Sequence, residues 1–106
     1  MRLNQKQLEV IRSTVAEMIP AGARYQLALF GSRLDDDVRG GDVDIYLEIT
    51  GLAKQRQQIL KRRLRPRLEE MLDLPVDLII QDHTEPLTLI SKIAREQGRV
   101  IQRSSD

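Results

Sequence analysis

Aspartates occur at three positions where the pattern of apolar residues predicts a strand. Asp42 and Asp44 form a D-x-D at the start of the strand expected over 42–49, and Asp77 interrupts the apolar strand expected over 76–80. Because side chains alternate across a strand, Asp42 and Asp44 project from one face, and Asp77 can join them if the strands are neighbours. Two carboxylates about 4 Å apart repel by roughly 4 kcal/mol at an effective dielectric near 20, so the cluster needs a cation or raised pKa values. Mg²⁺ suits it, since this ion takes a few carboxylates and leaves other positions to water and phosphate oxygens.

A Gly-Ser pair stands where the strand expected over 25–30 ends. Gly31 lets the backbone approach a phosphate closely, and Ser32 adds a hydroxyl donor. Arg33 can add a charge-assisted contact. Each motif alone is typical of a strand turn or a solvated strand edge, but together they favour phosphoryl transfer, with a metal and donors stabilising the transferring group.

Hydrophobic periodicity predicts the elements that must position these residues. Helices are expected over 5–19, 52–72 and 86–97, and strands over 25–30, 42–49, 76–80 and 99–102. Pro66 should kink or divide the second helix. We therefore predict an α/β fold, with a small mixed sheet of three to four strands, helices packed on one face, and the site on the open face.

Composition limits the classes of protein to which the chain can belong. Its 106 residues and 12.2 kDa predict one domain over 1–102 and a flexible C-terminal tail over 103–106. The absence of Cys and the single His exclude thiolate chemistry and multi-histidine metal sites. A net charge of +1 gives no global attraction for nucleic acid, so we do not expect a nucleic-acid partner. No apolar stretch approaches the roughly 20 residues of a membrane helix, and we expect a cytoplasmic protein without membrane contact.

Three segments resemble a known family. Residues 29–33, 41–45 and 76–79 (LFGSR, GDVDI and VDLI) are similar to the minimal nucleotidyltransferases of the DNA polymerase beta superfamily, and the resemblance spans nearly the whole chain. It implies the polymerase-beta-like nucleotidyltransferase fold. The pattern departs from the family in two ways: nine residues separate Ser32 from Asp42, a short spacing, and Gly41 replaces a frequent serine. Neither departure removes a ligand.

The resemblance implies a role for each matching residue. Gly31 and Ser32 would bind the nucleoside triphosphate, Asp42 and Asp44 would bind Mg²⁺, and Asp77 would complete the metal site or act as base. The implied reaction transfers a nucleoside monophosphate, AMP from ATP, to an acceptor hydroxyl with release of pyrophosphate, and two Mg²⁺ ions are expected.

The resemblance also implies a partner. Minimal nucleotidyltransferases occur beside small helical HEPN-domain proteins, in some cases as antitoxin and toxin, and the transferase is thought to silence its partner by adenylylating a tyrosine. We therefore expect a HEPN-domain acceptor and a homo- or hetero-oligomer. Larger relatives continue into a domain that holds the acceptor, and here we expect the partner to present it.

Other interpretations stay open at this point. The chain could be a binding module that neutralises its partner by occlusion alone, or an RNA-binding subunit that uses the basic cluster of the second helix. That cluster consists of Lys61, Arg62, Arg63, Arg65 and Arg67, and we interpret it as a solvated helix face. Tyr46 shares the acidic face and could stack on the base, although filling space is the simpler role. We interpret His83 as an ordinary surface residue.

Overall fold

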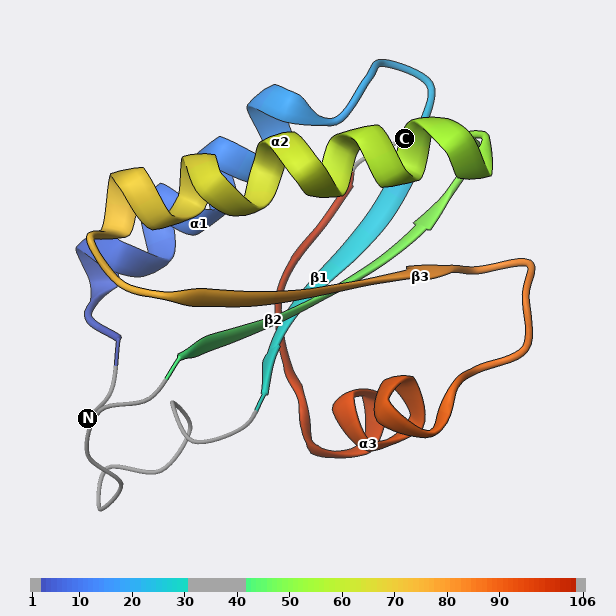
Figure 1. Cartoon of the computed structure of the whole chain (residues 1–106). Coiled ribbons are helices and arrows are strands. Elements are labelled where there is room, and N and C mark those ends of the chain that lie inside the picture. The colour runs from blue at the N-terminus through green and yellow to red at the C-terminus, as the bar shows by residue number, and fades with distance from the viewer. Residues whose placement is uncertain (1–2, 31–41, 105–106) are drawn as a thin grey trace.

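The computed structural model describes residues 3–30 and 42–104, and Figure 1 shows how their elements are arranged. In chain order these are α1 (Gln5–Met18), β1 (Arg24–Phe30), β2 (Val43–Thr50), α2 (Lys54–Leu72), β3 (Val76–Asp82), α3 (Leu89–Gln97) and β4 (Arg99–Arg103). Every predicted element is present, and its ends differ from the prediction by at most three residues.

The four strands form one mixed sheet in the order β3-β2-β1-β4. β2 runs parallel to β3 and antiparallel to β1, and β1 pairs antiparallel with β4. The parallel pair is possible because α2 carries the chain back from the end of β2 to the start of β3. The predicted mixed α/β fold is confirmed.

The main core lies between one face of the sheet and the helices α1 and α2, which Figure 1 shows on the same side. Alternate residues of β2 point into it, among them Val43, Ile45 and Leu47, all fully buried. α2 contributes a stripe of leucines spaced by four residues, which is one face of a helix. The stripe consists of Leu60, Leu64, Leu68 and Leu72.

The proline in α2 does not divide the helix. Pro66 lies within Lys54–Leu72 on the exposed side, between the buried Leu64 and Leu68. The carbonyl that loses its backbone donor therefore faces water, while the leucine stripe keeps both halves of the helix against the sheet.

α3 lies on the opposite face of the sheet from α1 and α2 (Figure 1). Its buried Ala94 packs against Ala28, Phe30 and Tyr46, which point away from the main core. The expectation of helices on one face is therefore corrected, because small and aromatic side chains make an apolar patch that α3 covers. Gly98 is the C-cap residue of this helix, and only glycine fits there, because a Cβ would collide with the carbonyl oxygen of Ala94.

β4 extends through Arg103, and the next residue, Ser104, is also paired. The backbone N–H of Ser104 donates to the Tyr25 carbonyl at 2.9 Å, and its Oγ accepts from the Tyr25 N–H at 2.9 Å. Residues 105–106 lie outside the described residues, and the domain boundary at residue 102 stays a prediction. Within 3–30 and 42–104, no helix combines the length and apolar character required to span a bilayer.

Candidate active site

Two of the predicted site residues lie side by side at one end of the sheet. Asp44 of β2 and Asp77 of β3 are direct partners in the parallel register. Their neighbours Val43, Ile45 and Leu78 point into the main core, so both carboxylates project from the opposite face. Neighbouring strands are about 4.8 Å apart, which places the two side chains within reach of one ion. Asp44 is half-buried and Asp77 is exposed.

Asp42, the third predicted ligand, is exposed and directly precedes β2. The following residue anchors it at the same end of the sheet, because the Val43 N–H donates to the Pro75 carbonyl at 2.9 Å. Pro75 is two residues before Asp77. The three aspartates therefore belong to one end of the sheet, with Asp44 and Asp77 in direct register.

Two side chains of α2 fix the start of β3, just before Asp77. Arg65 Nε donates to the carbonyl of Val76 at 3.0 Å, and the N–H of Val76 donates to Glu69 Oε2 at 2.9 Å. β3 is an edge strand, so these contacts occupy backbone groups that no further strand pairs. Arg65 and Glu69 are four residues apart on one face of the helix and act as a clamp on the edge.

The residues present fit a magnesium ion. Mg²⁺ is held in many sites by one or two carboxylates, while waters and substrate phosphates complete its octahedron. The adjacent Asp44 and Asp77 supply that number, and Asp42 can add another oxygen. Across residues 3–30 and 42–104, no three Asp, Glu or His side chains already form a cage for an ion.

The predicted phosphate-binding residues Gly31, Ser32 and Arg33 lie outside the described residues. The chain enters that segment from Phe30, which is the register partner of Asp44 in the antiparallel pair of β1 and β2. The chain therefore passes beside the carboxylates immediately before Gly31.

A buried polar cluster on the same face was not expected from the sequence. The Tyr46 hydroxyl donates to Glu48 Oε1 at 2.8 Å. Arg95 Nε lies 3.3 Å from the same oxygen, and His83 Nδ1 lies 3.1 Å from Glu48 Oε2. Burial acts to raise the pKa of Glu48, but the hydrogen bonds from Tyr46 and His83 and the charge of Arg95 outweigh it and lower that pKa. Burial, with the bond to Glu48, raises the pKa of the Tyr46 hydroxyl. Glu48 therefore stays ionised and structural.

This cluster changes two interpretations. Tyr46 is only 1% exposed, so it fills space beneath α3 and cannot stack on a base. His83 is exposed at the surface as expected, and it also joins the loop after β3 to the sheet. Strand alternation places Tyr46 and Glu48 on one face and could have indicated a local hydrogen bond, but their contacts with His83 and Arg95 depend on the tertiary fold.

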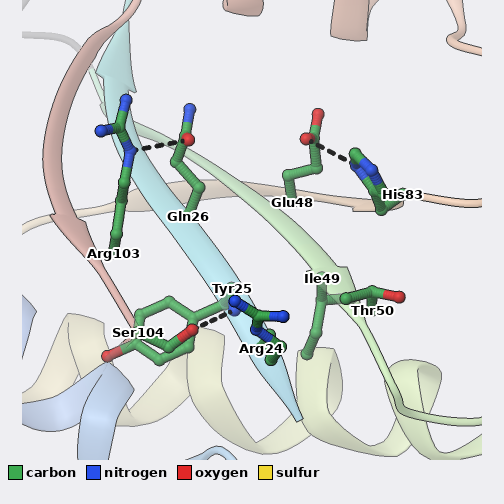
Figure 2. Close-up of a pocket in the computed structure, with 9 residues that line it drawn as sticks. All are labelled: Arg24, Tyr25, Gln26, Glu48, Ile49, Thr50, His83, Arg103 and Ser104. Atoms are coloured by element: carbon green, nitrogen blue, oxygen red, sulfur yellow. Dashed lines mark hydrogen bonds and ion pairs between the residues drawn. The ribbon is translucent and has the colours of Figure 1, made fainter. Parts of the chain in front are cut away.

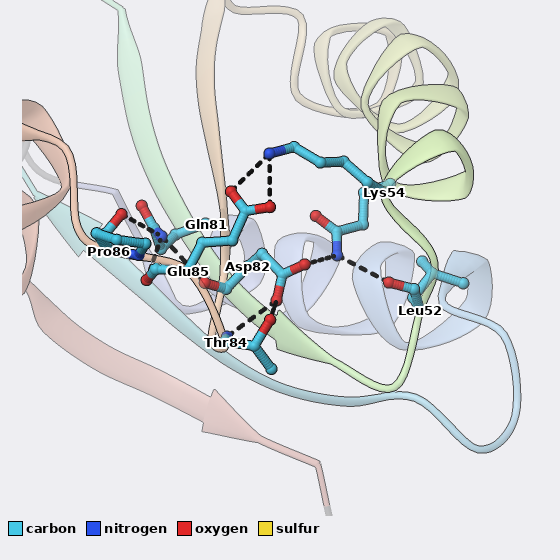
Figure 3. A network of polar contacts seen from close by, with 8 residues as sticks. Leu52, Lys54, Gln81, Asp82, Thr84, Glu85 and Pro86 are labelled. Carbon is cyan, nitrogen blue, oxygen red and sulfur yellow. Dashed lines mark hydrogen bonds and ion pairs between the residues drawn. The ribbon is translucent and has the colours of Figure 1, made fainter.

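A second polar network holds the far end of β3, where the strand leaves the sheet (Figure 3). Asp82 accepts from the Thr84 N–H at 2.9 Å, from the Thr84 hydroxyl at 2.7 Å and from Gln57 Nε2 at 3.0 Å. The bonds from Thr84 are the main reason that the pKa of Asp82 is lowered. Lys54 also pairs with Glu85 at 2.6 Å, so α2 is tied to the loop after β3. These acids are structural.

The basic cluster of α2 lies on the layer opposite the aspartates. Arg65 is occupied by the carbonyl of Val76, and Arg67 pairs with Glu70 at 3.3 Å. Lys61, Arg62 and Arg63 are exposed. The helix face is separated from Asp44 and Asp77 by the sheet, so it cannot contribute to their chemistry.

Comparison with known proteins identifies a family and two structures of similar fold. Residues 8–101 match the nucleotidyltransferase domain family. A chain of a mutant of the toxin-antitoxin complex MntA-HpeT has a similar fold, with a TM-score of 0.63, 21% identity and coverage of 94% of this chain and 73% of that one. A chain of the complex of tri-AMPylated HEPN toxin with MNT antitoxin from Shewanella oneidensis gives a TM-score of 0.61, 21% identity and coverage of 94% and 72%.

Among curated proteins, none is similar enough to count as a match. The family match nevertheless covers most of the chain, including Asp42, Asp44 and Asp77 and both strands that carry them. The predicted family and fold are confirmed, and this chain belongs to the nucleotidyltransferase domain family, whose enzymes transfer nucleotides.

Proposed function

We propose that this protein transfers a nucleoside monophosphate, AMP from ATP, to a hydroxyl group of a HEPN-domain partner. The observation that carries the proposal is the direct register of Asp44 and Asp77 on one face of a nucleotidyltransferase domain. Two carboxylates in direct register supply the one or two acidic ligands by which proteins hold Mg²⁺, which supports a metal-dependent reaction.

The predicted site residues would have different roles in this reaction. Asp42 and Asp44 would hold Mg²⁺ with Asp77, and the bound ion would neutralise charge on the phosphate oxygens. Gly31, Ser32 and Arg33 would bind the triphosphate through backbone, hydroxyl and guanidinium donors. Asp77 is exposed to solvent, which supports a role as the base that would accept the proton of the incoming hydroxyl. The acceptor oxygen then bonds to the α-phosphorus of ATP, and the bond to pyrophosphate breaks.

The acceptor is proposed from the similar structures. One of them holds an AMPylated HEPN toxin together with MNT antitoxin, which pairs a modified protein with a nucleotidyltransferase of this fold. The other is a mutant with two Asp-to-Glu changes two positions apart, the spacing of Asp42 and Asp44 here. A protein hydroxyl is therefore the acceptor that we propose, and a cytoplasmic complex is the setting.

The test is transfer of label from α-labelled ATP to the HEPN-domain protein encoded beside this chain, with and without Mg²⁺. We expect labelling by the native protein and loss of labelling in the double variant Asp42→Asn, Asp44→Asn. Asp73→Asn is the matched control, because Asp73 is exposed at the end of α2 with φ of 56°, a conformation that Asn tolerates.

Three results would contradict the proposal. Labelling that survives both substitutions would remove the aspartates from the mechanism. Full neutralisation of the partner by the double variant without nucleotide would instead favour occlusion by a non-catalytic binding module. Binding of RNA that depends on Arg62 and Arg63 but not on the aspartates would favour the RNA-binding subunit.

A further inference from the structure

A groove lies beside the first half of α2, on the helix layer of the molecule, and we call it the helical groove. It has a volume of about 400 Å³. Its charged lining residues are Arg56 and Arg63, and its apolar lining residues are Met18, Pro20, Leu52, Ile59 and Leu60. These residues belong to α1, α2 and the turns that follow α1 and β2, so the sheet separates the helical groove from Asp44 and Asp77.

The helical groove leaves apolar side chains open to water. Ile59 is 47% exposed, whereas Leu60, the next residue of α2, is buried and connects the groove to the main core. Ile59 follows Arg56 by three residues and precedes Arg63 by four, which is the spacing of one helical face. Exposed apolar surface with a polar rim is typical of an interaction site.

The positive charge of the helical groove is not balanced from within the chain. Within residues 3–30 and 42–104, neither Arg56 nor Arg63 forms an ion pair, and both are exposed. No acid is among the described lining residues. Glu17, which precedes Met18 in the sequence, is exposed and does not line the groove.

A pocket on the opposite face of the sheet differs in this respect (Figure 2). There His83 Nδ1 lies 3.1 Å from Glu48 Oε2, and Arg103 Nε donates to Gln26 Oε1 at 3.0 Å. These polar groups contact one another, whereas the two arginines of the helical groove have no acidic partner among the described residues. The helical groove therefore combines uncovered apolar surface with unbalanced charge.

We propose that the helical groove docks an acidic amphipathic helix of a partner protein. Arg56 and Arg63 are seven residues apart, so about 10 Å separates them along the axis of α2. A helix that lies along the groove would meet them with two carboxylates two turns apart, and an apolar side chain between the carboxylates would contact Ile59. The carboxylates would supply the ion pairs that the chain itself does not make. This docking goes beyond AMP transfer and does not depend on it.

Two other occupants match the helical groove less well. None of its described lining residues is aromatic, so RNA bases would find no ring on which to stack. A second copy of the chain would offer the exposed apolar side chains of α3, such as Ile90. That helix carries Lys92 and Arg95 but a single acid, Glu96, so its net charge has the same sign as that of the groove.

The test uses two synthetic peptides of about 18 residues, a length that supports a helix. Both carry the same stripe of leucines, and they differ only in the residues that flank it, which are Glu in one peptide and Lys in the other. Each peptide is titrated into the ¹⁵N-labelled full chain. We expect the Glu peptide to bind saturably, with shifts at Leu52, Ile59 and Leu60, and the Lys peptide to bind roughly tenfold more weakly or less.

Reversal of the groove's charge should reverse this preference. In the double variant Arg56→Glu, Arg63→Glu, the Glu peptide should bind roughly tenfold more weakly than to the native chain, and the Lys peptide should bind more tightly. The double variant Lys61→Glu, Lys92→Glu is the matched control, because both lysines are exposed outside the groove and the net charge changes equally. Its affinity for either peptide should change by no more than about threefold. Ile59→Gln should weaken binding of the Glu peptide, since it removes the apolar contact.

Equal weakening by the groove variant and its control would show a nonspecific charge effect and overturn the proposal. Equal binding of the two peptides to the native chain, or no saturable binding of the Glu peptide, would also overturn it. Binding of a single-stranded RNA that depends on Arg56 and Arg63, without binding of the Glu peptide, would assign the groove to RNA instead. A dimer that is lost in Ile59→Gln would assign it to a second copy. Asp44→Asn should bind the Glu peptide as the native chain does, so docking and AMP transfer are measured independently.

Discussion

The two ends of the sheet's polar face hold carboxylates in opposite ways. At one end Asp44 and Asp77 are direct neighbours of like charge, and Asp77 is exposed to solvent. At the other end Glu48 is buried and surrounded by a hydroxyl, an imidazole and a guanidinium. A carboxylate surrounded by donors stabilises the fold, whereas two neighbouring carboxylates repel each other, and a bound cation would relieve that repulsion. The comparison distinguishes an acid that maintains structure from the two acids that we propose take part in the reaction.

The largest effect is expected when Asp77 is replaced by its amide and both transfer activity and stability are measured. Asp77→Asn should lower AMP transfer by about 10³-fold, because it removes a metal ligand or the base. Its free energy of unfolding should stay equal or rise by up to about 1 kcal/mol, since like-charge repulsion with Asp44 is relieved. Initial rates with labelled ATP and urea denaturation measure the two quantities. Native activity in this variant would assign Asp77 to the fold alone.

Glu48→Ala should show the opposite pattern, with a large loss of stability. It leaves the buried Tyr46 hydroxyl without its acceptor and Arg95 without its ion pair, so we expect about 2–3 kcal/mol of destabilisation. For a chain of this size that lowers Tm by about 10 °C or more. Glu70→Ala is the control: its side chain is 71% exposed and pairs with Arg67, so its effect should stay within about 0.5 kcal/mol. Calorimetry that finds equal Tm values would contradict the structural role of Glu48.

Lowering the pH should remove the contribution of Glu48 to the free energy of unfolding, over a defined range of pH. The pKa of Glu48 is lowered in the folded protein, so its contribution to stability is complete above its ordinary value of 4.5. That contribution is lost as the pH falls through the lower folded value, because the folded protein then binds the proton that the unfolded chain already holds. Urea denaturation from pH 7 to pH 3 should therefore show a steeper loss in the native protein than in Glu48→Gln. Parallel curves would mean that Glu48 titrates normally.

The alternation of apolar and polar residues predicted the strands and the face from which each aspartate projects, because this alternation depends only on residues that are neighbours in the sequence. Asp44 between Val43 and Ile45 is an example. The adjacency of Asp44 and Asp77 had to be assumed, since it depends on α2 returning the chain to a parallel strand. The place of α3 and the contact of Arg95 with Glu48 were not predictable, because they depend on an apolar patch that the sheet assembles from two strands.

The smallest effect should come from the clamp that α2 places on β3. Glu69→Ala removes the acceptor for the Val76 N–H and should cost about 1 kcal/mol in the free energy of unfolding, while Glu69→Gln keeps an oxygen there and should stay near native stability. Transfer activity should fall more in Glu69→Ala than in Glu69→Gln, because Val76 directly precedes Asp77 and a loosened edge displaces that carboxylate. Amide hydrogen exchange at Val76 checks the cause: it should rise in Glu69→Ala and stay protected in Glu69→Gln. Equal exchange in both variants would show that pairing with β2 alone holds this end of the sheet, and that the proposed catalytic carboxylates need no support from the helix layer.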